Sequence, residues 1–239
     1  MNRLYINKII FDRPLDKESY LNKLPAVRSL AERRQLDIRK KVTFFVGENG
    51  TGKSTFIEAI AVAYGFNPEG GGRNFTFSTN QSHSELWEHI ILSKQELARD
   101  GYFLRAESFY NLATNIDELM VTGGYGGVSL HKQSHGESFM SLIQNRFGGD
   151  GLYILDEPEA ALSPTRLLTL LTEINRLVNN NSQFIIATHS PILMAYPDAD
   201  IFEFSADGIN LVNYRDTEHY NITKAFLSDP ERMLRILFE

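Results

Sequence analysis

The chain has 239 residues, of which 42% are hydrophobic and 23% charged, an ordinary globular composition with enough apolar residues for a core. Its net charge of −6 does not favour a polyanion binder, and the absence of cysteine excludes disulfides and thiolate metal sites. No apolar run approaches the roughly 20 residues of a membrane span, and the N-terminus lacks the apolar core of a signal peptide. We therefore expect a soluble, cytoplasmic protein with no membrane insertion of its own.

In the first half of the chain, apolar patterns and turn residues separate strands, helices and a loop. In chain order we expect a strand at 5–11, a short helix within 15–40, a buried strand at 42–46, a helix at 54–64, a loop at 67–74, side-sheet strands at 75–78 and 86–92, and a core strand at 102–105.

The second half alternates short apolar strands with helices. In chain order we expect a glycine loop at 122–127, a helix from about residue 134, a strand at 152–155, a periodic helix at 166–178, a strand at 184–187, and a closing hairpin of 201–204 with 209–212. This alternation predicts an α/β fold with a mainly parallel core sheet flanked by helices, plus an antiparallel side sheet near residues 1–12 and 75–92. The whole chain, 1–239, reads as a single domain.

A glycine-rich run directly follows the buried strand at 42–46 and fits the pattern G-x-x-x-x-G-K-[ST]. Its glycines let several backbone N–H groups point into one anion-sized hollow, to which the helix N-terminus adds partial positive charge. Lys53 is expected to reach the β- and γ-phosphates, and the Ser54 hydroxyl to ligate Mg²⁺. A plain turn between strand and helix is the alternative. The candidate nucleotide-binding residues are Gly47, Glu48, Asn49, Gly50, Thr51, Gly52, Lys53, Ser54 and Thr55.

The apolar strand at 152–155 ends in two carboxylates, Asp156 and Glu157. Side chains at the carboxyl ends of parallel strands emerge where ligands bind in open α/β sheets. We expect Asp156 to hold the Mg²⁺ shell and Glu157 to orient and deprotonate an attacking water. The alternative is an acidic pair that ends a strand at a solvated turn.

His189 follows the strand at 184–187, which we expect to lie beside the strand that ends at Asp156. An imidazole there can sense the γ-phosphate and steady the nucleophilic water, so His189 is a second catalytic candidate. A lone histidine after a strand can equally be a structural residue.

Ser134 and Glu137 open a helix after the glycine loop and form a capping-box pattern, which alone accounts for these residue types. The functional hypothesis is that this helix N-terminus, through Ser134 and the Gly136 backbone, binds a second phosphate group. Both can be true together.

The order of these motifs resembles the ABC-type ATPase superfamily from residue 42 to about 195. Residues 47–55 match its Walker A motif, 152–157 its Walker B and catalytic glutamate, and His189 its switch histidine. Residues 134–137 resemble its signature motif, with His135 and Glu137 where Gly and Gln are usual. In that family two subunits pack head to tail, and each signature helix closes on the ATP of the other. The resemblance thus implies an ATP-dependent homodimer, with Ser134 and Gly136 acting in trans from a helical sub-lobe near 95–150.

The run after Glu157, Pro-Glu-Ala-Ala-Leu-Ser-Pro, resembles stand-alone AAA, RecF-, SMC- or OLD-like ATPases more than transporter subunits. Only 81 residues separate Lys53 from Ser134, which leaves no room for a long coiled-coil arm and implies a compact head. The family's Gln-loop position falls on Glu107 or on Gln81, and no adenine-stacking aromatic is identifiable.

The sequence thus predicts a Mg²⁺-dependent, ATP-binding and ATP-hydrolysing protein that dimerises on ATP and drives a conformational cycle. Two alternatives for its role stay open. One is an ATP-binding subunit that serves a transporter or another effector subunit. The other is a nucleic-acid-associated ATPase in DNA repair or phage defence, for which DNA-stimulated turnover and a steep salt dependence are expected.

Overall fold

The structure is a computed structural model that describes residues 4–72, 84–107, 109 and 134–239. Its main feature is a seven-stranded sheet in the order β10-β9-β3-β8-β7-β6-β4. The five central strands are parallel, and the two edge strands, β4 and β10, pair antiparallel with their neighbours. The strand bounds are β3 Val42–Gly47, β4 Gly71–Gly72, β6 Asp100–Arg105, β7 Gly151–Asp156, β8 Gln183–Ala187, β9 Ala199–Ser205 and β10 Gly208–Val212.

A second, antiparallel sheet has the order β2-β1-β5, formed by Gln35–Asp37, Lys8–Phe11 and Ile90–Ser93. It is the expected side sheet, although the strand predicted at 86–92 is wrong over its first part. Residues Glu85–His89 form a 3-10 helix, η2, because the Ser84 side chain caps it by accepting from the Leu86 N–H at 3.2 Å. The strand predicted at 75–78 and the glycine loop at 122–127 lie outside the described residues.

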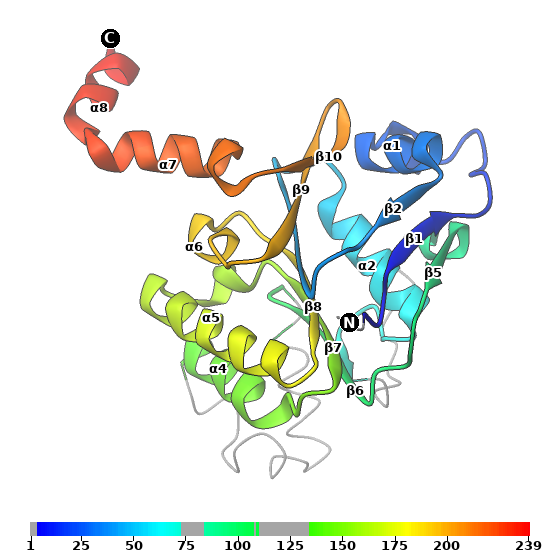
Figure 1. Ribbon diagram of the computed structural model, residues 1–239. Helices are drawn as coiled ribbons and strands as arrows, with labels where there is room; N and C mark the ends of the chain where they lie inside the picture. The colour runs from blue at the N-terminus through cyan, green and yellow to red at the C-terminus, as the bar shows by residue number, and fades with distance from the viewer. Residues whose placement is uncertain (1–3, 73–83, 108, 110–133) are drawn as a thin grey trace.

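Helices cover both faces of the main sheet (Figure 1). On one face lie α1 and α2, and on the other α4 and α5. The helix bounds are α1 Pro25–Arg33, α2 Lys53–Tyr64, α4 His135–Arg146, α5 Pro164–Asn179, α6 Pro191–Met194, α7 Glu218–Ser228 and α8 Pro230–Phe238. The short 3-10 helices are η1 Tyr20–Lys23, η2, η5 Pro158–Ala161 and η6 Tyr214–Asp216.

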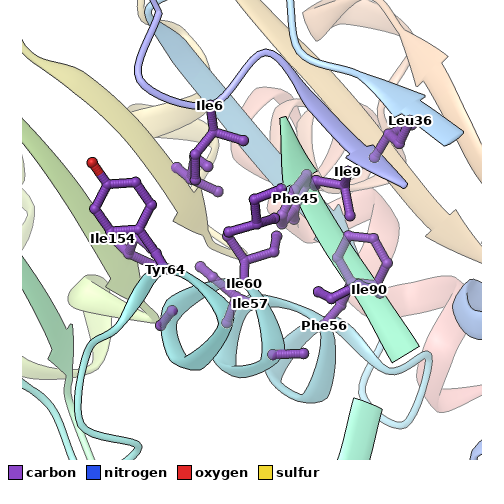
Figure 2. Packing of buried hydrophobic residues seen from close by; sticks show 14 of the residues in the cluster. Ile6, Ile9, Leu36, Phe45, Phe56, Ile57, Ile60, Tyr64, Ile90 and Ile154 are labelled. Atoms are coloured by element: carbon purple, nitrogen blue, oxygen red, sulfur yellow. The ribbon is translucent and has the colours of Figure 1, made fainter. Parts of the chain in front are cut away.

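The core divides into two apolar clusters, one on each face of the main sheet. Alternate residues of β3 serve them: Phe45 packs toward α2, whereas Phe44 and Val46 pack toward α4 and α5. Figure 2 shows the first cluster, with Phe56 and Ile57 of α2 among its members. Burial on both faces explains why the central strands read as continuous apolar runs in the sequence.

The helices α7 and α8 form a separate feature at the C-terminus. Figure 1 shows them extending away from the body, and neither contains a buried residue. The sequence prediction ended at residue 212 and did not anticipate them, nor the short strands β2 and β4. Across the described residues, no helix combines the length and the apolar character that a membrane crossing requires.

Candidate functional site

The carboxyl end of β3 turns through the glycine-rich run into α2, as the sequence predicted. Gly47 has φ of 134°, and a Cβ there would clash with the carbonyl oxygen of Phe204, so no other residue fits without a shift. Glu48, Asn49 and Gly50 are exposed, and the Thr51 hydroxyl donates to the Glu48 carbonyl at 2.8 Å. Residues 48–50 of the loop are therefore open to solvent, while Gly47 packs against β9.

Lys53 opens α2 but points back into the loop. Its side chain is almost completely buried, and Nζ donates to the carbonyls of Gly47 at 2.7 Å and Glu48 at 2.9 Å. Burial lowers the pKa of the ammonium, and the carboxylates of Glu157 and Asp156 oppose that change. Ser54 and Thr55 follow in the first turn of α2 and are half-buried. The loop thus holds a desolvated cation close to two acidic side chains.

Asp156 is the last residue of β7, which lies one strand away from β3, with β8 between them. Its carboxylate is 7% exposed, and burial raises its pKa to about 7 against the opposing charge of Arg105. Its Oδ1 is buried and has no hydrogen-bond partner in the part of the chain that the structure describes. An oxygen of this kind fits a Mg²⁺ ligand, because a cation would satisfy the atom that the protein leaves unpaired.

Mg²⁺ would need further oxygen ligands. The described residues contain no group of three or more histidine, cysteine, aspartate or glutamate side chains that could hold a metal. Asp156 and Ser54 therefore fit the common arrangement in which Mg²⁺ takes one or two protein ligands and shares the rest with phosphate and water.

Glu157 adopts a left-handed backbone conformation, with φ of 50° and ψ of 52°. Its N–H donates to the Ala187 carbonyl at 3.0 Å, which fixes the turn against the end of β8. A non-glycine residue in this region stores strain and is held there by its surroundings. The turn places Glu157 Oε1 3.4 Å from Nε2 of His189, so the two expected catalytic residues lie side by side.

His189 follows β8, the direct neighbour of β7, as the sequence predicted. Its backbone N–H donates to Oε1 of Glu159, a carboxylate whose pKa is raised by burial. Burial, and then the charge of Lys53, lower the pKa of the His189 imidazole, which favours the neutral ring. Its Nδ1 lies 3.0 Å from Nε2 of His219.

Two residues that sequence reasoning did not select lie in this region. One is His219; the other is Arg105, the last residue of β6, which sits opposite Asp156 in the sheet register. Arg105 Nη1 lies 2.7 Å from Glu58 Oε2, and Arg105 Nε lies 3.6 Å from Asp156 Oδ2. The only sequence signal for Arg105 was its place at the end of a predicted core strand.

The two candidates for the Gln-loop position are Gln81 and Glu107. Gln81 lies outside the described residues. Glu107 is described, and its carboxylate is 86% exposed at 3.9 Å from Arg105. Of these two residues at the end of β6, Arg105 is therefore the more shielded, with 19% of its side chain exposed.

The start of α4 has the predicted capping box. The Ser134 N–H and hydroxyl both donate to Glu137 Oε2, at 3.0 and 2.6 Å, and Arg166 lies 3.2 Å from Glu137 Oε1. Gly136 is buried, and a Cβ there would clash with Arg166 and the Ala161 carbonyl. Close packing thus accounts for the glycine, while Ser134 is exposed at the helix N-terminus.

Two family models match successive parts of the chain. The one described as "AAA domain" matches residues 23–112, and the one described as "AAA domain, putative AbiEii toxin, Type IV TA system" matches residues 120–195. A search of curated proteins finds no match.

Among solved structures, the chain is similar to cbiO1 from Clostridium perfringens, described as part of the ABC transporter complex cbiONQ. The identity is 16% and the TM-score 0.52, over 99% of this chain and 100% of that chain. The SMC head domain from Thermotoga maritima aligns at 15% identity with a TM-score of 0.45, over 88% of this chain and 99% of that chain. At this level of identity the first likeness concerns the fold, and it agrees with the P-loop α/β architecture expected from the sequence.

Proposed function

We propose that this chain, which is an ABC- and AAA-like P-loop ATPase by its family matches and fold, binds ATP at residues 47–55 and hydrolyses it. The observation that carries the proposal is the meeting of three strand ends. Lys53 follows β3, and the negative charge of Glu157, which follows β7, raises the pKa of its ammonium. Glu157 in turn lies 3.4 Å from His189, which follows β8. A phosphate cradle, a base candidate and a polar sensor are thereby brought to one edge of the sheet.

In this proposal Lys53 and the backbone amides of the loop bind the β- and γ-phosphates. Lys53 would exchange its two carbonyl partners for phosphate oxygens, which offset its charge better. Glu157 orients the attacking water and accepts its proton, and His189 donates from Nε2 toward the γ-phosphate. Ser54 and Asp156 would hold Mg²⁺, which supplies charge neutralisation when bound.

Two variants distinguish ATP binding from ATP hydrolysis. Lys53→Ala should lose most ATP affinity, measured with a fluorescent ATP analogue, because the described loop offers no second cation for the phosphates. Lys8→Ala is the matched control, since Lys8 pairs with Asp37 on the side sheet. Wild-type affinity in a folded Lys53→Ala variant would falsify the phosphate-loop assignment.

Glu157→Gln should keep ATP affinity and lose turnover by roughly 10²–10⁴-fold, because the amide keeps the size of the side chain but cannot accept the proton. Phosphate release under saturating ATP measures this. Turnover within a few-fold of wild type would place the base elsewhere.

We further propose an ATP-dependent head-to-tail homodimer, in which Ser134 and the Gly136 backbone face the ATP of the partner. The support is the exposed N-terminus of α4, a 12-residue helix whose partial positive charge suits a phosphate. Glu157→Gln with ATP and Mg²⁺ should elute as a dimer in size exclusion, and the ADP form as a monomer or a weaker dimer.

Adding Ser134→Arg should abolish that dimer and leave monomer ATP binding intact. Asn145→Arg, near the other end of α4, is the matched control and should dimerise. A Glu157→Gln variant that stays monomeric with ATP would leave Ser134 with its capping role only.

The ATPase cycle must act on a further molecule, and its identity is a separate question. We propose an ATPase that acts on an effector subunit or a nucleic acid, and the absence of cysteine fits a reducing compartment such as the cytoplasm. Proteins or nucleic acids that co-purify with the ATP-trapped Glu157→Gln dimer, but not with Lys53→Ala, would identify it.

A further inference from the structure

A pair of histidines joins the nucleotide site to the C-terminal helices. His189, in the loop after β8, places Nδ1 3.0 Å from Nε2 of His219, the second residue of α7. The ring centroids are 5.2 Å apart and the planes are inclined by 53°, so the contact runs between nitrogen atoms and not between ring faces. Figure 1 shows that α7 otherwise leads away from the body.

The position of the proton in this contact follows from the surroundings of the two rings. A neutral imidazole has one N–H and one acceptor nitrogen, so one ring must donate and the other accept. Nε2 of His189 faces the Glu157 carboxylate at 3.4 Å, and an acceptor nitrogen there would meet a negative charge. The proton of His189 therefore belongs on Nε2, which leaves Nδ1 to accept from His219.

His219 is suited to donate. It lies in the first turn of α7, two residues after the N-cap Thr217. Among the described residues, Nε2 of His219 has its one hydrogen bond with His189, and its buried Nδ1 has no partner. A proton on Nε2 of His219 therefore meets an acceptor in Nδ1 of His189, whereas a proton on Nδ1 of His219 would meet no acceptor among the described residues.

The start of α7 is held firmly enough to position this ring. Thr217, the N-cap, is fully buried; its hydroxyl donates to the Tyr214 carbonyl at 2.8 Å and accepts from the Tyr220 N–H at 3.3 Å. Asn221 Nδ2 donates to the carbonyls of Arg215 and Thr217. These bonds fix the backbone on both sides of His219.

We propose that His219 is a positioning residue: by donating from Nε2 to Nδ1 of His189, it holds His189 in the tautomer that carries its proton on Nε2, toward Glu157 and the γ-phosphate. The buried Nε2 of His189, which lies 3.4 Å from Glu157 Oε1 and makes no hydrogen bond among the described residues, is then a donor that faces the site. This inference rests on the proposed ATPase function for its consequence, but not for its geometry.

The direct test is the tautomer of His189, read from long-range ¹H–¹⁵N NMR of the nucleotide-free protein and assigned with His189→Gln. We expect the Nε2–H tautomer in the wild type and a shift toward a mixture in His219→Leu. His219→Gln should restore the wild-type signature, because its amide N–H can donate from nearly the same position. His89→Leu, on η2, is the matched control and should change nothing.

The second readout is turnover. Removing a partner that orients a functional imidazole costs roughly 10–100-fold in metal sites, and we expect about tenfold here in kcat for His219→Leu, with ATP affinity unchanged within twofold. His219→Gln should recover most of it. A structural role would instead lower affinity and stability together in both variants.

The outcomes separate the two proposals. A wild-type His189 in the Nδ1–H tautomer, or an unchanged tautomer in His219→Leu, overturns the positioning role whatever the turnover. A wild type that binds ATP and never releases phosphate overturns the proposed hydrolysis, while the tautomer measurement still decides the role of His219. If His219→Leu does not fold, His219→Ala, which also removes the donor, takes its place in both measurements.

Discussion

Replacing Arg105 by methionine tests the buried charge network beside the site. The guanidinium is 19% exposed and, besides the exposed Glu107, pairs with two carboxylates that are largely shielded from solvent: Glu58, 12% exposed at 2.7 Å, and Asp156, 7% exposed at 3.6 Å. Methionine keeps much of the apolar packing but leaves both acids without their cation. Glu58 keeps one bond from the Ser84 N–H, so the full penalty for an uncompensated charge falls mainly on Asp156. Removing one partner of a buried ion pair costs roughly 3–5 kcal/mol when the other stays charged. At pH 8 Asp156 can instead take up a proton for at most about 1.4 kcal/mol, because its pKa in the wild type is about 7, so with the smaller loss at Glu58 we expect about 2 kcal/mol.

The loss should depend on pH in a defined direction. The pKa of Asp156, about 7, already lies above its ordinary value of 3.8, and Arg105 holds it down. Without Arg105 this pKa rises further, so the added loss of stability accumulates as pH rises above about 7 and shrinks toward pH 6, where the acid is neutral in both proteins. Urea unfolding in EDTA at pH 6 and pH 8 measures both. Arg176→Met, which breaks an exposed pair within α5, should cost only a few tenths of a kcal/mol. A loss below about 1 kcal/mol for Arg105→Met, or one equal at both pH values, would refute this reasoning.

Three other changes have defined outcomes. Asp100→Asn should destabilise by roughly 1.5–3 kcal/mol at pH 7 in urea unfolding, because the carboxylate has charged and neutral donors around it. Burial raises the pKa of the Asp100 carboxyl, but its hydrogen bonds lower it more, so the net pKa is below the ordinary value. The contribution of Asp100 to stability is therefore fully present above about pH 4 and is lost as pH falls through the lowered pKa. Gly47→Ala should cost about 2 kcal/mol or more in the same assay, since φ of 134° and the clash with Phe204 both oppose it. Deleting residues 229–239 should shift Tm by less than about 2 °C, because α8 has no buried residue; a larger shift would reveal a packing role for α8.

Much of the fold was predictable because its signals are local. Strands buried on both faces give continuous apolar runs, which marked β3, β7 and β8, and the helical spacing of α5 marked one face against the sheet. The prediction at 86–92 went wrong because an apolar run does not distinguish a strand from a capped turn, and the Ser84 cap decided for the turn. β2 and β4, of three and two residues, are too short for any periodic signal.

Some residues of the candidate site also have a local signal in the sequence, and others do not. Asp156 and Glu157 could be selected because their place after an apolar strand has meaning in an α/β sheet. Arg105 and His219 could not, because each matters through a partner that the sheet register or the packing of α7 brings to it. No spacing along the chain records that an arginine at one strand end faces an aspartate 51 residues later, as the pairing Arg105↔Asp156 does.

The last prediction is that the buried charge of Asp156 lowers the stability of the free protein but is needed to bind Mg²⁺. A pKa raised from 3.8 to about 7 corresponds to roughly 4 kcal/mol of unfavourable free energy above pH 7, since one pKa unit is worth about 1.4 kcal/mol. Asp156→Asn removes the buried charge but also weakens the hold on Arg105, so we expect the variant to be more stable than wild type in EDTA at pH 8 by about 1–2 kcal/mol. Adding Mg²⁺ with ADP should then raise Tm in the wild type and much less in the variant, because a ligand stabilises only the state that binds it. An Asp156→Asn variant that is less stable in EDTA, or that gains as much from Mg²⁺ with ADP as wild type does, would mean that the unpaired Oδ1 is not kept for a cation.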